Sequence, residues 1–259
     1  GTQSVTITIN ENESAPTVTL AASATSIAEN AGSSITITAS LSGTTSQDVT
    51  VSLSSSSTAT EGTDYGTVSD ITITSGSTSG TATFTPTDDS IYDATSNETA
   101  TVSIDSVSGG DALENGNQSV TITITDNESA PTVTLSRSAA AIDENSSSTV
   151  TITATLSNAT YQDVTVSIGA SGGTEGTDYA TISDITISAG STTGTTSLDP
   201  TDDSVYEDDE VVTVTIDGVS GGSASESGSQ SVTITITENE SAPTVTLSVS
   251  ATSIAENAG

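Results

Sequence analysis

An internal repeat constrains this chain more than any other feature of its sequence. The segment SAPTVTL occurs at residues 14–20, 129–135 and 241–247, so its copies are 115 and 112 residues apart. Other segments return in the same order, namely QSVTITI at 3–9, 118–124 and 230–236, TEGTDY at 60–65 and 174–179, and PTDDS at 86–90 and 200–204. A fixed order of motifs at this spacing predicts tandem domains of the same fold.

The repeat divides the 259 residues into two complete domains, which we place at 15–128 and 129–240. Residues 1–14 match only the C-terminal strand of a preceding repeat, and residues 241–259 match only the N-terminal strand of a following one. We therefore interpret the chain as a window from a longer array. No flexible linker separates the two complete repeats, so we expect the domains to be arranged end to end.

Each repeat alternates apolar residues with Ser and Thr at a period of two. In SSITITASLS (33–42), for example, Ile35, Ile37, Ala39 and Leu41 share one face. Such alternation is typical of half-buried strands, and Thr suits the solvent face. The first repeat has seven candidate strands, at 17–20, 34–41, 48–53, 67–74, 79–85, 98–105 and 118–125. The predicted fold is all-β: tandem immunoglobulin-like, seven-stranded antiparallel β-sandwiches.

Composition excludes several classes of function. The chain has Asp+Glu 34 against Lys+Arg 1, with no His and no Cys, and its net charge is −33. This charge opposes binding to nucleic acid, and we expect no membrane insertion in this segment. Without His, Cys or Lys there is no nucleophile–base pair, so we do not expect an enzyme. Disulfides and thiolate metal sites are also excluded.

The acids are expected to gather at one end of each sandwich. If each strand crosses the length of the domain, alternate loops lie at the same end. That end of the first repeat receives Glu29, Glu61, Asp64, Asp88, Asp89, Asp93, Asp126 and Glu128. Many oxygen ligands without His or Cys favour Ca²⁺ over zinc or copper. The simpler interpretation is a solvated acidic surface.

The motifs IAEN, TEGTDY, DDSVYEDDE and VTITDNE, in this order and at domain spacing, resemble the Calx-β domain. This resemblance covers both full repeats and both terminal fragments. It implies a sandwich that binds calcium through acids from the loops at one end. The implied metal ligands in the first repeat are Glu29, Asp64, Asp88, Asp89, Asp93, Asp126 and Glu128. In the second repeat they are Glu144, Asp178, Asp202, Asp203, Glu207, Asp209, Glu210, Glu238 and Glu240.

Some side chains keep two interpretations at this stage. Glu61 and Glu175 are either calcium ligands or residues that fix the turn before GTDY. Tyr65, Tyr92, Tyr179 and Tyr206 are expected to be core or loop anchors. The acid loop DDSVYEDDE of the second repeat is denser in acids than DDSIYDATSNE of the first. We therefore expect the second repeat to bind more calcium, or to bind it more tightly.

The predicted function is a calcium-binding structural spacer array in an extracellular or cell-surface stalk, adhesin or filament, with Ca²⁺ rigidifying domain ends and junctions. Its partners would be neighbouring repeats of the same long chain and, in a filament, copies of itself. The alternatives are a ligand-binding adhesin module and a regulatory calcium-sensing domain.

Overall fold

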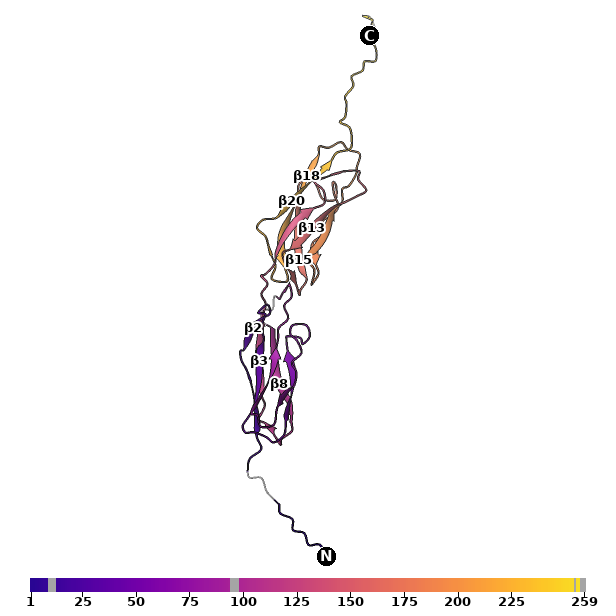
Figure 1. The fold of residues 1–259 in the computed structure, drawn as a ribbon. Coiled ribbons are helices and arrows are strands. Elements are labelled where there is room, and N and C mark those ends of the chain that lie inside the picture. Colours follow the sequence, from indigo (N-terminus) through magenta and orange to yellow (C-terminus); the bar gives the residue numbers. More distant parts are fainter. Residues whose placement is uncertain (9–12, 94–97, 254, 257–259) are drawn as a thin grey trace. The chain divides into compact units, whose positions relative to one another are not determined.

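The computed structural model describes residues 1–8, 13–93, 98–253 and 255–256. The chain divides into two compact units, the first unit (Gly1–Ser129) and the second unit (Ala130–Gly259). Each contains a β-sandwich, visible in Figure 1. Within the described ranges there is no helix long and apolar enough to cross a membrane. Parts of the terminal fragments, at 9–12, 254 and 257–259, lie outside the described residues.

The first unit is a sandwich of a four-stranded and a five-stranded sheet. The four-stranded sheet has the order β6 (Ser79–Phe84), β3 (Ile35–Leu41), β1 (Thr17–Ala22) and β9 (Leu113–Glu114). The five-stranded sheet has the order β2 (Ser26–Ala28), β10 (Ser119–Thr125), β8 (Glu98–Ser108), β4 (Val49–Ser57) and β5 (Ile71–Ile73). The short strand β7 (Ile91–Tyr92) lies in the acid loop before β8.

The second unit repeats this topology. Its four-stranded sheet has the order β17 (Thr193–Leu198), β13 (Val150–Leu156), β11 (Thr132–Arg137) and β19 (Ser225–Glu226). Its five-stranded sheet has the order β12 (Ala141–Asp143), β20 (Ser231–Thr237), β18 (Glu210–Ser220), β15 (Val164–Ser171) and β16 (Ile185–Ile187). Strand β14 (Ala159–Thr160) follows β13. The predicted immunoglobulin-like β-sandwich is therefore confirmed in both units.

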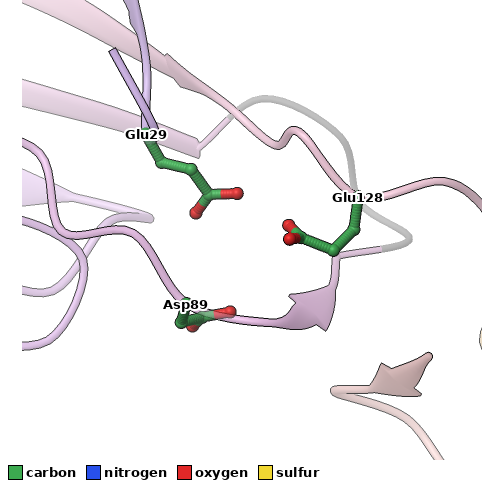
Figure 2. Close-up of side chains that lie close together, drawn as sticks. All are labelled: Glu29, Asp89 and Glu128. Atoms are coloured by element: carbon green, nitrogen blue, oxygen red, sulfur yellow. The ribbon is translucent and has the colours of Figure 1, made fainter. Parts of the chain in front are cut away.

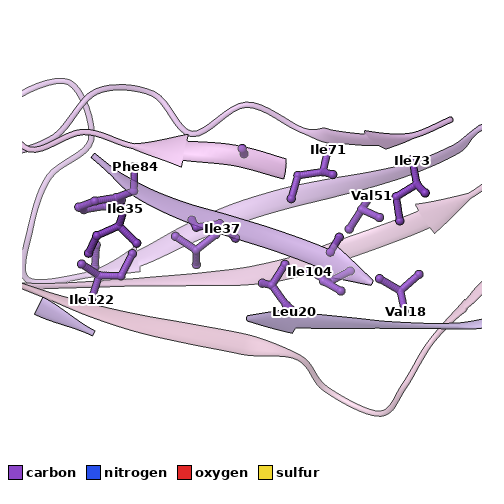
Figure 3. Close-up of a cluster of buried hydrophobic side chains, with 14 of the residues drawn as sticks. Val18, Leu20, Ile35, Ile37, Val51, Ile71, Ile73, Phe84, Ile104 and Ile122 are labelled. Carbon is purple, nitrogen blue, oxygen red and sulfur yellow. The ribbon is translucent and has the colours of Figure 1, made fainter. Parts of the chain in front are cut away.

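The core of each unit is built from strands in which apolar and polar residues alternate, and the apolar face of each strand packs into the core. Figure 3 shows the first core, in which Ile37 and Ile122 from opposite sheets are fully buried. Tyr65 stacks on Phe84 with 4.6 Å between the ring centroids, and it is buried as predicted. Alternation places one face of each strand in this core, and no acid is among the buried residues of the described chain.

Two strand predictions are wrong in detail. The first strand continues beyond residue 20 and then changes sheets, so that β2 pairs in parallel with β10. Strand β1 also pairs in parallel with β9, so the sandwich is not purely antiparallel. The chain crosses between the sheets after Ser23, whose backbone N–H and side-chain oxygen bond Thr36. This crossing brings the chain after β2 beside the end of β10.

The strand predicted at 67–74 is also wrong, since β5 covers only Ile71–Ile73. The side chain of Asp70 replaces a backbone partner here, because its Oδ1 accepts the N–H of Leu53 at 2.9 Å. That bond lies where the register of β4 shifts between Ser52 and Leu53. Asp184 accepts the N–H of Ile168 in the same way at 2.9 Å in the second unit.

The remaining predicted tyrosines lie in the core or in the acid loops. Tyr179 of the second unit is buried in the core. Tyr206, in the acid loop before β18, is 42% exposed and is not a core anchor. Tyr92, the corresponding residue of the first unit, is half-buried. The described parts of the terminal fragments form no strand, and Val5 and Val245 are exposed by 87% and 99%.

Candidate metal centre

At one end of each unit, four loop segments bring carboxylates together, and we call this end the acidic pole. In the first unit these segments hold Glu29 after β2, Asp64 before β5, Asp89 before β7 and Asp126 after β10. The turn at Asp64 is fixed locally, because its Oδ2 accepts the N–H of Thr60 at 2.6 Å. This bond tethers the Asp64 carboxylate within the turn.

A triad of carboxylates is the centre of the first pole. Oxygen atoms of Glu29, Asp89 and Glu128 all lie within 4.8 Å of one another, and Figure 2 shows their side chains facing a common space. Glu128 has one oxygen, Oε1, that accepts the amide of Asn127 at 2.7 Å. Its second oxygen, Oε2, is buried and has no hydrogen-bond partner. A buried acceptor without a donor is costly, so this oxygen marks a position where a cation would be stabilised.

The Asp126 side chain connects two backbone segments of the first pole. One of its oxygens accepts the N–H of Glu128 at 2.9 Å, and the other accepts the N–H of Asp93 at 2.8 Å. Burial alone would raise the pKa of Asp126, but these two bonds, with hydrogen bonds from Glu128 and Glu29, lower it overall. Asp126 is therefore a fixed negative charge that links the end of β10 to the acid loop.

The crowding of carboxylates changes the pKa of Glu29. Burial is the largest cause that raises the pKa of Glu29 to about 8, and hydrogen bonds with the Glu128 and Asp126 side chains raise it further. The N–H of Asn127, 3.0 Å from Glu29 Oε1, opposes this shift. Without a cation, the triad therefore retains a proton near neutral pH.

A second group of acids surrounds Glu98, a residue that the sequence analysis missed. Burial, followed by the charges of Asp64, Asp93 and Asp89, raises the pKa of Glu98 to about 7. Glu98 begins β8, as Glu210 begins β18 in the second unit. The internal repeat could have identified Glu98 as a candidate ligand, because Glu98 is 112 residues before the predicted ligand Glu210 and aligns with it.

The second pole contains a triad of different composition. Oxygen atoms of Glu144, Glu238 and Glu240 all lie within 4.8 Å of one another. Glu240 Oε2, like Glu128 Oε2, is buried without a hydrogen-bond partner. A side-chain hydrogen bond with Glu238 is the largest cause that raises the pKa of Glu240 to about 7, and burial adds to it.

Glu238 occupies the place of Asp126 in the second pole. It accepts the N–H of Glu240 at 2.7 Å and the N–H of Glu207 at 2.5 Å. The bond from Glu240 N–H is the largest cause that lowers the pKa of Glu238 to about 2. The charge of Glu238 is fixed by two backbone donors, as the charge of Asp126 is.

The other predicted ligands of the second unit also lie at this pole. Asp203 and Asp209 accept backbone N–H groups of Val205 at 2.6 Å and Glu238 at 3.0 Å. Asp202 accepts the amide of Asn239 at 3.0 Å. Asp178 accepts the N–H of Thr174. Burial and neighbouring acids, first among them Asp178, raise the pKa of Glu207 and Glu210. Several acids of the dense loop thus stabilise the loop itself.

Three predicted residues have other surroundings. Asp88 does not belong to the triad but lines a cavity beside Glu29. Glu61 and Glu175, left open above, bond hydroxyls, since Glu61 accepts Ser55 Oγ at 2.8 Å and Glu175 accepts Thr181 Oγ1. These two bonds favour the turn-fixing interpretation of Glu61 and Glu175.

The donor set fits a hard divalent cation. Each triad brings three carboxylates together, from three loops in the first unit and from two in the second. Ca²⁺ takes 6–8 oxygen ligands in flexible geometry, so carboxylates on loops suit it. Within the described residues no Lys or Arg contacts either triad, because the only such residue, Arg137, donates to Ala140 O and Thr233 Oγ1. Metal binding by the sixteen predicted ligands stays a prediction.

The comparison with protein families gives a different match for each repeat. Residues 11–128 match the model of the Calx-beta domain. The first repeat is therefore similar to the Calx-beta domain. Residues 130–238 match the model of the LapA domain instead. Neither model that matches the chain describes an enzyme family.

Solved structures similar to the chain include two-domain and adhesin proteins. CBD12 from CALX1.2 is 15% identical, with 73% of this chain and 75% of that chain covered and a TM-score of 0.36. Invasin, a bacterial integrin-binding protein, is 18% identical, with 86% and 40% covered and a TM-score of 0.38. The Yersinia pseudotuberculosis adhesin InvE is 16% identical, with 85% and 58% covered and a TM-score of 0.34. No curated protein matches the chain.

Proposed function

We propose that each acidic pole binds Ca²⁺ and that the bound ion stabilises the loops at that end of the sandwich. The observation that carries this proposal is the pair of buried, unpartnered oxygens, Glu128 Oε2 and Glu240 Oε2. Each lies in a group of three carboxylates whose oxygens are within 4.8 Å. A bound cation supplies a partner to each of these two oxygens.

Electrostatics supports the same proposal. With a net charge of −33 and a single Arg, the chain has almost no cationic side chain to neutralise its poles. Carboxylates this close together either retain protons, as the raised pKa of Glu29 indicates, or bind a cation. Ca²⁺ fits better than Zn²⁺ because all the ligands are oxygens, and better than Mg²⁺ because loops do not impose octahedral geometry.

We further propose that the repeats are spacers in a cell-surface adhesin. The matches to the Calx-beta and LapA domains support this role. The last strand of the first unit ends at Thr125, and the first strand of the second begins at Thr132, so six residues join them. In this proposal calcium fixes Asp126 and Glu128 within that short connection and so limits its motion. Neighbouring repeats, and other copies of the chain, are the proposed partners.

Calorimetric titration of the metal-free chain with CaCl₂ tests calcium binding. We expect saturable binding that MgCl₂ at the same concentration does not reproduce, and a matched loss in Glu128→Gln and Glu240→Gln. Asp111→Asn is the control, because Asp111 lies in the connection between β8 and β9, outside both triads, at a backbone φ of 52° that Asn tolerates. Absence of heat and of any thermal stabilisation by calcium would contradict the proposal.

A further inference from the structure

The first pole contains a second feature that the calcium proposal does not use, namely a polar cavity beside the triad. Its volume is about 260 Å³. It lies between the chain after β2 and the chain after β6, and its polar lining includes Glu29, Asn30, Ser33, Ser34, Thr85 and Asp88. Glu29 belongs to both the cavity and the triad, so the cavity opens beside the proposed cation.

Most polar side chains of the lining are exposed. The hydroxyls of Ser34 and Thr85 bond each other at 2.7 Å. The side chains of Asn30, Ser33 and Asp88 make no hydrogen bond with the described part of the chain. Together they offer an amide, a hydroxyl and a carboxylate, which both donate and accept hydrogen bonds. A ligand that enters the cavity meets these groups without breaking protein contacts.

The lining selects a class of ligand. Two carboxylates in the lining repel anions, and Pro86 is the one lining residue with an apolar side chain. Drug-sized ligands occupy cavities from about 300 Å³ upward, so this cavity suits a smaller molecule. A sugar ring has this size, and its adjacent hydroxyls both donate and accept hydrogen bonds.

We propose that this cavity binds a neutral sugar unit, with the ring hydroxyls bonded to Asn30, Ser33 and Asp88 and directed toward the calcium held at Glu29. The inference rests on the proposed calcium function, because the cation neutralises the carboxylates and offers a further contact to sugar oxygens. It gives the first unit a ligand-binding role in addition to its role as a spacer.

The second unit supplies a natural contrast. Asn145, Thr149 and Asp202 occupy the positions of Asn30, Ser34 and Asp88, but Asp199 replaces Thr85. This substitution adds a third carboxylate and removes the hydroxyl that bonds Ser34. We therefore assign the sugar subsite to the first unit, and Thr85→Asp introduces the carboxylate that the second unit carries at this position.

Saturation-transfer NMR of the complete calcium-loaded chain with single neutral hexoses tests the inference. A ligand of this size is expected to bind with a Kd on the order of 1 mM. We expect signals that disappear on chelation and weaken at least tenfold in Asn30→Ala and Thr85→Asp. Asn145→Ala, the matched change in the second unit, is expected to leave them unchanged, and the melting temperature in calcium verifies that each variant folds.

The outcomes separate the two proposals. If calorimetry shows calcium binding and no hexose gives a signal, the sugar site is wrong and the calcium function stands. If calcium does not bind, the calcium proposal fails. A hexose signal that survives chelation, or that Asn30→Ala leaves intact, would overturn the site assigned here.

Discussion

The two acidic poles both bring three carboxylates together, but they use different residues to do so. The first triad has one acid from each of three loops. The second triad has Glu144 from one loop, and Glu238 and Glu240 from the single segment that follows β20. Position 126 is Asp and its counterpart 238 is Glu, yet both accept one N–H two residues ahead and one N–H from the acid loop. The hydrogen-bond pattern is thus preserved while the side chain differs by one methylene.

This comparison shows that the acids of a pole have two distinct roles. Hydrogen bonds lower the pKa values of both Asp126 and Glu238. The side chain and then the backbone N–H of Glu128 are the largest lowering causes for Asp126, and the backbone N–H of Glu240 is the largest for Glu238. Glu29 and Glu240 have raised pKa values, about 8 and about 7, because they are buried or contact a neighbouring carboxyl. The first role needs no metal. The second leaves charge that a cation would neutralise, so removal of calcium should affect both units.

Removal of calcium is expected to have the largest effect. If each pole holds an ion at a hundredfold excess over its Kd, chelation removes about 2.7 kcal/mol of stability per site. For domains of this size that lowers the melting temperature by roughly 10 °C. Calorimetry with and without EGTA at matched ionic strength measures the shift, and hydrogen exchange resolves the units. Loss of protection in one unit alone would break the equivalence of the poles.

Neutral variants of the two triads come next. Glu29→Gln and Glu144→Gln each remove one charged ligand, so we expect calcium affinity to fall at least tenfold in the altered unit and to stay unchanged in the other. Hydrogen exchange of the full chain at graded calcium concentrations measures both units together. The same titration tests whether the denser loop of the second unit gives tighter binding, which stays a prediction. Equal loss in both units from one variant would mean that the poles are coupled.

Removal of the backbone acceptors is expected to have a smaller effect. Asp126→Ala and Glu238→Ala each leave two N–H groups without their carboxylate, which lowers the free energy of unfolding by about 1–3 kcal/mol. Asp126→Glu and Glu238→Asp, which exchange the two side chains, should cost less because a carboxylate remains. Urea unfolding in metal-free buffer separates this loss from calcium binding. If Asp126→Glu and Glu238→Asp lower the free energy of unfolding as much as the Ala variants do, side-chain length determines the stability more than the two hydrogen bonds do.

The last prediction concerns the pH dependence of the stability. A carboxyl group with a raised pKa in the folded state stabilises the fold below its unfolded pKa, and this contribution is lost as pH rises through the folded value. Glu29, Glu98 and Glu240 have folded pKa values of about 8, 7 and 7, so the metal-free chain should lose stability between about pH 4.5 and 8. Melting curves across this range measure it. With saturating calcium the decline should vanish, and a metal-free curve that rises with pH would contradict the assignment.

The sequence by itself determined the sandwich and its repetition. Alternating apolar residues such as Ile35, Ile37 and Leu41 can be buried on only one face of a strand, so the period of two implies the sheet. The aligned repeats also determined which positions correspond, including Glu98 and Glu210. Aligning the predicted ligands of the second repeat with the first repeat would have identified Glu98 as a candidate site residue without a structure.

Only the tertiary structure decided where strands change partners and which carboxylates meet. The crossing after Ser23 and the short β5 depend on side-chain bonds to distant backbone groups, from Ser23 to Thr36 and from Asp70 to Leu53, which no local pattern encodes. In the same way, Asp89 joins the first triad and Glu238 joins the second because loop conformation sets the distances between their oxygens. A sequence shows which loops carry acids, but the distances between the oxygens depend on the hydrogen bonds that fix each loop.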